Sequence, residues 1–391
     1  MMSLPRLIAR HSRHLASRLR EHSHVVDLVA RSYRAAKASN DGAAAFLPML
    51  ERGLLDRPDD LDDDASHRIV KDVTALYARC KNYSVDLAAP YQIGGEWATH
   101  ISERRRSYDL LARQEHEEIR ALLANFWRNE LGAIAANYDY YRNVASGNRH
   151  TRTHFVKQML KDYEIWKHYV CNDITQLRAP TFGNAWGLYI EDTLVVPQAF
   201  RFHRNATFIL ELLGTIAKPV VAEIGGGYGG MAYYLLSQNK RLTYLDFDIP
   251  ETLFLAAFYL AKAFPDRKIL WFSEPGPITS DLIAQYDIIL MPHYALQQLE
   301  DLSVHLFHNA ISLSEMSSET ISEYVKQIQR TTRHYFYHVN IDRAGVVNKG
   351  YERVPGSRFP IDASAFKKLL RIYDLYFGPT GPYCEFLYQR G

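Results

Sequence analysis

The spacing of hydrophobic residues changes about half-way along the chain. Before residue 195, apolar residues recur every three or four positions, most clearly over 67–87 and 108–138, which predicts amphipathic helices. After about residue 205, short apolar runs typical of buried strands alternate with helical segments. We therefore expect a mainly helical N-terminal domain at 1–195 and an α/β domain at 196–391, with a parallel sheet covered by helices on both faces.

The second half divides into individual elements. The pattern predicts a helix at 206–217, a strand at 220–224, a glycine-rich turn, a helix at 231–238, a strand at 241–248 and a long helix that Pro265 ends. Three strand-like runs follow, at 268–273, 286–293 and 303–313. Two of them supply the third and fourth strands of a minimal sheet, and the other is an insertion or an edge. A helix capped by Ser318 and a strand at 334–342 come next.

The segment YDLYFGPTGPYCEFLYQR, at 373–390, is two strand-like runs joined by GPTGP. So short a connection forces an antiparallel hairpin. A parallel sheet that ends in one antiparallel hairpin is typical of methyltransferases, whereas dinucleotide-binding sheets usually end in a parallel strand. The fold class predicted is therefore a Rossmann-like methyltransferase sheet with a terminal antiparallel hairpin.

Three stretches of the first half lack helical periodicity. We expect the acidic run at 56–64 to be a solvated loop and the segment at 90–97 to interrupt the helices. The segment at 179–203 is expected to be a connector along the domain boundary.

The segment VAEIGGGYGGMAYYL, at 221–235, combines a strand, a tight turn and a helix start. Such a turn lets the backbone approach a ligand closely. Its glycines satisfy the dinucleotide pattern G-x-G-x-x-G through Gly225, Gly227 and Gly230. They also satisfy an acid-x-G-x-G-x-G pattern through Glu223, Gly225, Gly227 and Gly229, so a dinucleotide and S-adenosylmethionine are both candidate ligands.

Glu223 favours S-adenosylmethionine. A carboxylate at the end of the first sheet strand would repel a diphosphate held at the helix N-terminus. The ammonium and sulfonium of S-adenosylmethionine are positively charged, so a negatively charged Glu223 would attract them. An acid ending the second strand is placed to accept the ribose hydroxyls; Asp248 is our first candidate and Asp246 the second, although Asp248 can also be a helix N-cap.

These residues resemble those of a known family. The segments EIGGGYGGMAYYL, DFDIPE and FHNAISLSEMSSETISEY are similar to motifs of bacterial sugar O-methyltransferases found in gene clusters for surface polysaccharides. The similarity covers the C-terminal half and extends more weakly into PYQIGGEW and FGNAWG. The chain departs from the family pattern at His305 and His308, which leaves the acceptor open, and it also shares features with small-molecule O-methyltransferases.

The resemblance implies a cytoplasmic enzyme that methylates a hydroxyl of a sugar or polysaccharide with S-adenosylmethionine. It also implies which residues form the site: Glu223, Gly225, Gly227, Gly229 and Asp248 would hold the cofactor, and Asn309, Ser312 and Glu315 would lie near the reacting hydroxyl. Two other classes stay open, an NAD-dependent oxidoreductase and a binding protein that keeps the fold without catalysis.

Methyl transfer to a hydroxyl requires alignment of the reactants and a base for the hydroxyl proton. His293 ends a strand-like run and titrates in a useful range. Glu315 follows another such run, where partial burial would raise its pKa. We name both as candidate catalytic bases, with Asn309 as an orienting residue; the alternatives are a surface histidine and an acid at a helix start. No metal site is predicted, unless the fold gathers Asp246, Asp287 and Asp342.

Composition narrows the choice of partners. With 46 basic and 44 acidic residues the formal net charge is +2, which gives no overall field to recruit nucleic acid. The three cysteines form no C-x-x-C pair, which fits a reducing compartment. No stretch approaches about 18 uninterrupted apolar residues, so no membrane span is expected.

The basic N-terminus lacks the apolar core of a signal peptide. It can form an amphipathic helix that contacts anionic lipid or packs on its own protein. A homodimer formed through the helical half is a further expectation.

Overall fold

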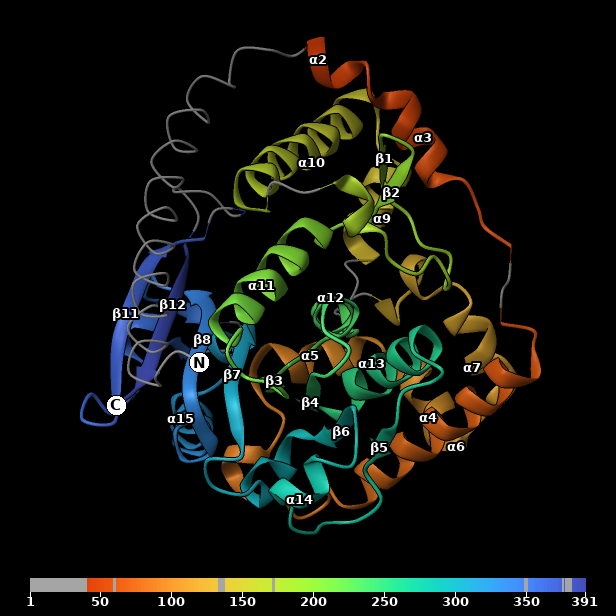
Figure 1. Ribbon diagram of the computed structural model, residues 1–391. Coiled ribbons are helices and arrows are strands. Elements are labelled where there is room, and N and C mark those ends of the chain that lie inside the picture. The colour runs from red at the N-terminus through yellow and green to blue at the C-terminus, as the bar shows by residue number, and fades with distance from the viewer. Residues whose placement is uncertain are drawn as a thin grey trace.

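The computed structural model describes residues 41–58, 61–132, 138–170, 173–347, 351–374, 376 and 382–391. The predicted N-terminal membrane-contacting helix lies outside these residues. The centre of the fold is a sheet of eight strands in the order β11-β12-β8-β7-β3-β4-β6-β5 (Figure 1). Its strands are β3 Val220–Ile224, β4 Thr243–Asp248, β5 Ile269–Trp271, β6 Ile288–Pro292, β7 Val304–Ala310, β8 Thr332–Ile341, β11 Phe366–Tyr373 and β12 Tyr383–Arg390.

Six of these strands are parallel, and the chain reverses direction across the sheet at β3. From β3 it passes to β4 on one side, and it later returns to β7 on the other side; both pair with β3 in parallel. Right-handed crossovers that progress in opposite directions put their helices on opposite faces. Accordingly α12 Gly230–Gln238 and α13 Pro250–Ala263 lie on one face, and α15 Ser318–Thr331 lies on the other (Figure 1). The carboxyl end of β3 is therefore the topological switch point, where open α/β sheets bind ligands.

The predicted sheet and its terminal hairpin are confirmed. All three strand-like runs join the sheet, and the first of them, β5, is its edge. β12 pairs antiparallel with both β8 and β11. The first strand of this hairpin was predicted too far along the chain. It was expected to begin at Tyr373, which is the residue where β11 ends. Phe366–Tyr373 reads FKKLLRIY, which has no regular two-residue alternation, and a bulge between Lys368 and Leu370 interrupts its pairing with β12, so the hydrophobic pattern did not reveal this strand.

The first half contains mostly helices in its described part. They are α2 Asp41–Ala44, α3 Leu47–Leu54, α4 Asp64–Asn82, α5 Gly95–Glu103, α6 Arg105–Arg113, α7 His116–Leu123, α9 Tyr138–Ala145 and α10 Arg149–Val170, with short 3-10 turns η2 Ala89–Tyr91, η3 Phe126–Arg128 and η4 Ile174–Leu177. The helical periodicity over 108–138 corresponds to several short elements. α6 ends where Gln114 adopts a left-handed conformation with φ of 55°, and α7 and η3 follow as separate elements.

The bounds of other elements also differ from those predicted from the sequence. The segment at 179–203 is more than a connector, since it contains the hairpin β1 Leu188–Ile190 and β2 Thr193–Val195 and the start of α11 Ala199–Leu212. The N-cap of α15 is Ser317, whose side chain accepts from the Thr320 amide, and not Ser318. The acidic run at 56–64 ends by capping α4, because Asp63 accepts from the Ser66 amide.

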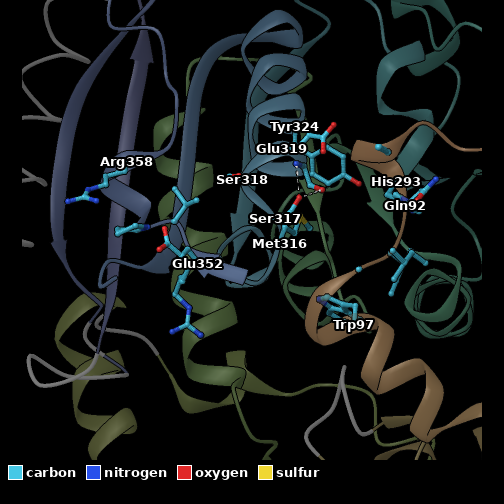
Figure 2. A pocket seen from close by; sticks show the side chains of 18 residues that line it. Gln92, Trp97, His293, Met316, Ser317, Ser318, Glu319, Tyr324, Glu352 and Arg358 are labelled. Carbon is cyan, nitrogen blue, oxygen red and sulfur yellow. Dashed lines mark hydrogen bonds between the residues drawn. The ribbon is translucent and has the colours of Figure 1, made fainter. Parts of the chain in front are cut away.

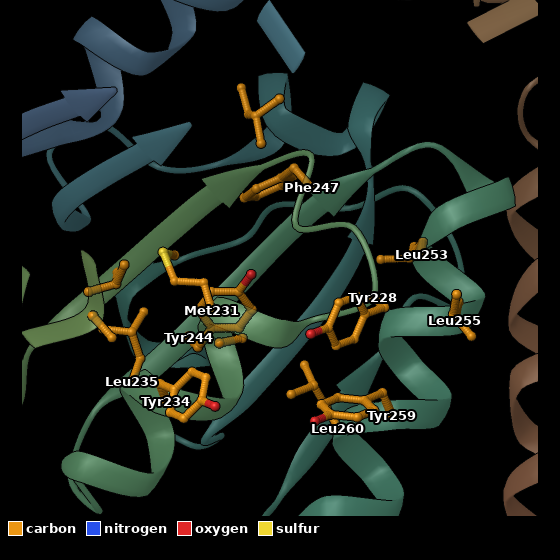
Figure 3. Close-up of a cluster of buried hydrophobic side chains, with 14 of the residues drawn as sticks. Tyr228, Met231, Tyr234, Leu235, Tyr244, Phe247, Leu253, Leu255, Tyr259 and Leu260 are labelled. Atoms are coloured by element: carbon orange, nitrogen blue, oxygen red, sulfur yellow. The ribbon is translucent and has the colours of Figure 1, made fainter. Parts of the chain in front are cut away.

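The helical half packs directly on the sheet half. α4 lies along α13, where Lys81 forms a 2.9 Å ion pair with Glu251 and Arg79 donates to the Phe272 carbonyl. The core continues beneath the glycine turn as a cluster that includes Tyr228, Met231, Tyr259 and Leu260 (Figure 3). The division into two domains stays a prediction. Among the described residues, none of the helices has the length and apolar character to cross a bilayer.

Shorter elements complete the fold. α14 Ser280–Ile283 precedes β6, whereas η5 His293–Gln298 and η6 Ser312–Glu315 follow β6 and β7. The remaining ones are η7 Gly356–Arg358 and the small hairpin of β9 Gly345–Val347 with β10 Tyr351–Arg353. Both η5 and η6 follow parallel strands directly, so they border the switch point.

Candidate functional site

The glycine turn at the end of β3 leaves space above its backbone. Gly225 and Gly227 have φ angles of 75° and 64°, in the left-handed region that glycine adopts at no steric cost. A Cβ added to Gly225 would lie 2.5 Å from the Ser312 hydroxyl, whereas one added to Gly227 would meet no atom of the described residues within 4 Å. Gly227 is therefore the point of the turn that a ligand can approach.

Two aspartates from β4 hold this turn in place. Asp248 accepts from the Gly227 amide at 3.1 Å through one oxygen. Its other oxygen accepts from the Ile249 amide at 2.7 Å and the Thr252 hydroxyl at 3.1 Å. Asp246 accepts from the Gly226 amide at 3.3 Å. The structure thus brings both predicted cofactor acids to the turn. The N-cap of α13 is Ile249 and not Asp248, although Asp248 accepts from the Thr252 hydroxyl in the first turn of that helix.

Glu223 differs from its expected state. The side chain is 4% exposed, and its Oε2 accepts a 2.7 Å hydrogen bond from the Tyr244 hydroxyl. Burial raises the pKa of Glu223 to about 8, with the Tyr244 hydrogen bond opposing this and the Asp248 charge adding to it. Burial likewise raises the pKa of Asp246 and of Asp248. Burial thus favours the neutral form of Glu223, whereas a negative charge was expected from the sequence.

A buried amide network joins β7 and β8 to the turn. Asn309 donates to the Ile224 carbonyl at 2.9 Å and to the Ser312 hydroxyl at 2.6 Å. Asn340 donates to Asn309 at 2.8 Å, and its carbonyl oxygen accepts from the Ser314 amide at 3.1 Å. Asn309 and Ser312 thus fix η6 against the end of β3. Asn340 belongs to this network and was missed, because nothing in its local sequence marks it.

His293 lies one strand further along the sheet edge and is 4% exposed. Its Nε2 lies 2.8 Å from the Tyr91 carbonyl oxygen, which can only accept, so Nε2 carries the proton. Nδ1 then holds the lone pair; it is buried and makes no hydrogen bond to the described parts of the chain, although the Asp248 backbone lies close enough to act on the pKa of the ring. Burial lowers the pKa of His293, which favours the neutral ring. A neutral histidine with a free lone pair has the form that a general base requires.

Glu315 ends η6 and contacts the helical half. Its Oε2 accepts a 3.1 Å hydrogen bond from the indole Nε1 of Trp97, on α5. The two residues are 218 positions apart in sequence. Trp97 was not singled out from the sequence, although PYQIGGEW, which contains it, was part of the resemblance.

A cavity of about 650 Å³ lies beside these residues (Figure 2). Trp97 and Gln92 line it from the helical half, and Ser317 and Tyr324 from the start of α15. Glu352 and Arg358 line another side. His293 and Ile249, the residue after Asp248, also line it, so the cavity adjoins the acid that holds the glycine turn. Its volume is in the ordinary range for small-molecule sites.

The three aspartates considered for a metal are not gathered. Asp246 lies at the turn, Asp287 bonds to Arg267 before β6 begins, and Asp342 pairs with Arg371 after β8. Within the described ranges, no group of three histidine, cysteine or acidic side chains is arranged to hold a metal ion.

Strand order, terminal hairpin and glycine turn together define a Rossmann-like methyltransferase fold. No family model matches the chain, and no curated protein matches its sequence.

Solved structures similar to the chain include several methyltransferases. A SAM-dependent methyltransferase from Aquifex aeolicus is 15% identical, covering 49% of this chain and 92% of its own, with a TM-score of 0.31. A magnesium protoporphyrin IX methyltransferase from Synechocystis PCC 6803, with bound SAM, is 11% identical over 49% and 81%, with a TM-score of 0.32. A protein from Galdieria sulphuraria described as a sarcosine dimethylglycine methyltransferase is 12% identical over 58% and 97%, with a TM-score of 0.37. At these values none of them assigns an activity to this chain.

Proposed function

We propose that the chain is an S-adenosylmethionine-dependent O-methyltransferase whose acceptor is a sugar or polysaccharide hydroxyl. The observation that carries the proposal is the open space over Gly227, beside Asp248, at the switch point of the sheet. The resemblance of the glycine turn and of the Asn309–Met316 segment to sugar O-methyltransferases supports the acceptor class. A cytoplasmic location, a homodimer and N-terminal membrane contact accompany this proposal as predictions.

The residues present fit this cofactor. Gly227 has room for a ligand, and Asp248 can accept further hydrogen bonds from ribose hydroxyls, since a carboxylate has about four acceptor positions. Three acidic side chains near the turn suit a positively charged ligand better than a diphosphate. A cation would favour their ionised forms and lower their raised pKa values. S-adenosylmethionine therefore stays the preferred cofactor even if Glu223 is neutral before the cofactor binds.

When bound, S-adenosylmethionine supplies an activated methyl group on a sulfonium sulfur. Transfer of this methyl group to the acceptor oxygen would leave S-adenosylhomocysteine and would release the hydroxyl proton. The protein must hold the acceptor in line and accept the hydroxyl proton. We assign the proton to Nδ1 of His293, because this atom holds a lone pair and His293 lines the cavity; Nδ1 is buried in the structure, so the ring must shift when the acceptor binds.

Calorimetric titration with S-adenosylhomocysteine and with NADH tests the cofactor. We expect the first to bind and the second not to; binding of NADH alone would favour the oxidoreductase. For the base, His293→Ala should lower kcat about a hundredfold or more with unchanged affinity for S-adenosylhomocysteine. A normal kcat in this variant would exclude His293. A protein that binds the cofactor yet transfers no labelled methyl group in single turnover would be a binding protein.

The small-molecule alternative has its own support. Apolar side chains, among them Ile93, Met316 and Val354, also line the cavity. Labelled methyl transfer to phenols but not to saccharides would establish this alternative.

A further inference from the structure

We propose that Trp97 is the surface on which a ring of the acceptor saccharide stacks, and that Glu315 holds the Trp97 indole in place instead of acting as the base. This inference rests on the proposed function and names the residues that would recognise its substrate. It reassigns one of the two candidate bases to a positioning role.

The orientation of Trp97 is fixed from two sides. Its single hydrogen-bond donor, Nε1, is used by Glu315 at 3.1 Å. The His100 ring packs edge-on against it, with ring centroids 6.2 Å apart and an interplanar angle of 79°. A half-buried tryptophan held in this way presents a flat apolar surface to the cavity at little entropic cost.

Glu315 is well placed to position Trp97, because it is tied to the glycine turn. It ends η6, which begins at Ser312 and is held through Asn309 to the Ile224 carbonyl. The position of the indole is therefore linked to the end of β3, where the cofactor is proposed to bind.

Glu315 is poorly placed to be the base. The described residues that line the cavity include its neighbours Met316 and Ser317 but not Glu315. Its Oε2 faces the indole N–H, whereas His293 reaches the cavity. A base must lie within hydrogen-bond reach of the proton it removes. Positioning and proton removal are thereby divided between Glu315 and His293.

The rest of the cavity matches a neutral polyhydroxylated ligand. Its charged lining residues are two acids and two bases, Glu319, Glu352, Arg353 and Arg358, so their formal charges cancel. Hydroxyl and amide groups lie near the aromatic surfaces; Gln92, Ser317 and Thr320 contribute them. Tyr324 offers a second aromatic wall and is 3% exposed. A saccharide ring has the matching chemistry, with apolar C–H faces and a rim of hydroxyls.

The experiment first confirms that the wild-type protein binds S-adenosylhomocysteine. Methyl-labelled S-adenosylmethionine is then incubated with an array of unmethylated bacterial saccharides and, in parallel, with a panel of phenols and catechols. We expect label on one or more saccharides. Binding of S-adenosylhomocysteine with label only on the phenol panel, or on neither set, would overturn this inference while leaving the cofactor site intact. Failure to bind S-adenosylhomocysteine would instead count against the proposed function.

Four variants then test the two roles with the labelled saccharide. Glu315→Gln keeps an oxygen that accepts from Trp97 but is not basic, so kcat and KM should stay within about threefold of wild type. Glu315→Ala and Trp97→Phe should raise KM several-fold with little change in kcat. Trp97→Ala should raise KM roughly tenfold or more, which is the usual cost of truncating a central aromatic contact. Affinity for S-adenosylhomocysteine, measured in each variant, confirms that the fold is retained.

Two results would contradict the proposed roles of Glu315 and Trp97. A drop in kcat of about a hundredfold in Glu315→Gln at unchanged KM would make Glu315 the base. A Trp97→Ala variant with unchanged KM would remove the stacking surface.

Discussion

The hydroxyl of Tyr244 donates a 2.7 Å hydrogen bond to Glu223 on the neighbouring strand, where the two side chains are 0% and 4% exposed. The bond favours the ionised form of Glu223, against the larger effect of burial, and the other carboxyl oxygen lies 4.0 Å from Nε2 of His308. This buried acid makes stability and ligand binding depend on pH.

The first prediction concerns stability. Burial raises the pKa of Glu223 from 4.5 to about 8, so between these values the folded state holds a proton that the unfolded state has lost. The free energy of unfolding should therefore fall as pH rises from about 4.5 to 8. Glu223→Gln removes this contribution. We expect the difference in Tm between Glu223→Gln and wild type to increase, in favour of the variant, by roughly 2 °C or more as the pH rises from 5 to 8. Scanning calorimetry measures both Tm values. Parallel Tm profiles would show that Glu223 titrates normally.

The second prediction concerns cofactor binding. A sulfonium and an ammonium near the turn favour ionised carboxyls, so S-adenosylmethionine should bind with release of protons at pH 7. Its affinity should increase between pH 6 and 8. Titrations in buffers of different ionisation enthalpy measure the protons released. S-adenosylhomocysteine, which lacks the sulfonium charge, should release fewer, and Glu223→Gln should reduce the number for both ligands.

A third prediction isolates the open point of the turn. Gly227→Ala places a Cβ where no described atom lies within 4 Å, at a φ of 64° that costs roughly 1–2 kcal/mol for other residues. Affinity for S-adenosylhomocysteine should fall at least tenfold, because the methyl group occupies the ligand's space. Gly276→Ala is the matched control, since its Cβ also meets nothing within 4 Å, without a positive φ. Equal affinities of the two variants for S-adenosylhomocysteine would show that the ligand does not bind over Gly227.

A fourth prediction concerns the ion pair of Arg204 and Glu385, which lie 2.7 Å apart with side chains 1% and 0% exposed. Breaking a buried pair costs about 3–5 kcal/mol. Glu385→Gln should destabilise more than Arg204→Met, because a stranded carboxyl can take up a proton while a stranded guanidinium stays charged. Urea unfolding measures both. Asp139→Asn, in the exposed pair with Arg142, should change stability by less than about 0.5 kcal/mol. Equal losses in the two buried variants would contradict this reasoning.

Local patterns were sufficient for the parallel sheet and the glycine turn. The predicted strand at 220–224 coincides with β3, and the second strand ends at Asp248 as expected. Both follow from short, nearly continuous apolar runs, which are typical of parallel strands buried on both faces, and from the conformational freedom of glycine. Local patterns failed at 108–138, where helical periodicity continues through Gln114 although the chain turns there.

The sequence by itself determined the strands, the turn, the acids beside it and the antiparallel end of the sheet, because each depends on residues close together in the chain. The protonation of Glu223 depends on burial and on Tyr244, 21 positions away. The partnership of Glu315 with Trp97 spans 218 positions. Only the tertiary structure decided these two, since desolvation and contact between distant segments arise when the helical half packs against the sheet.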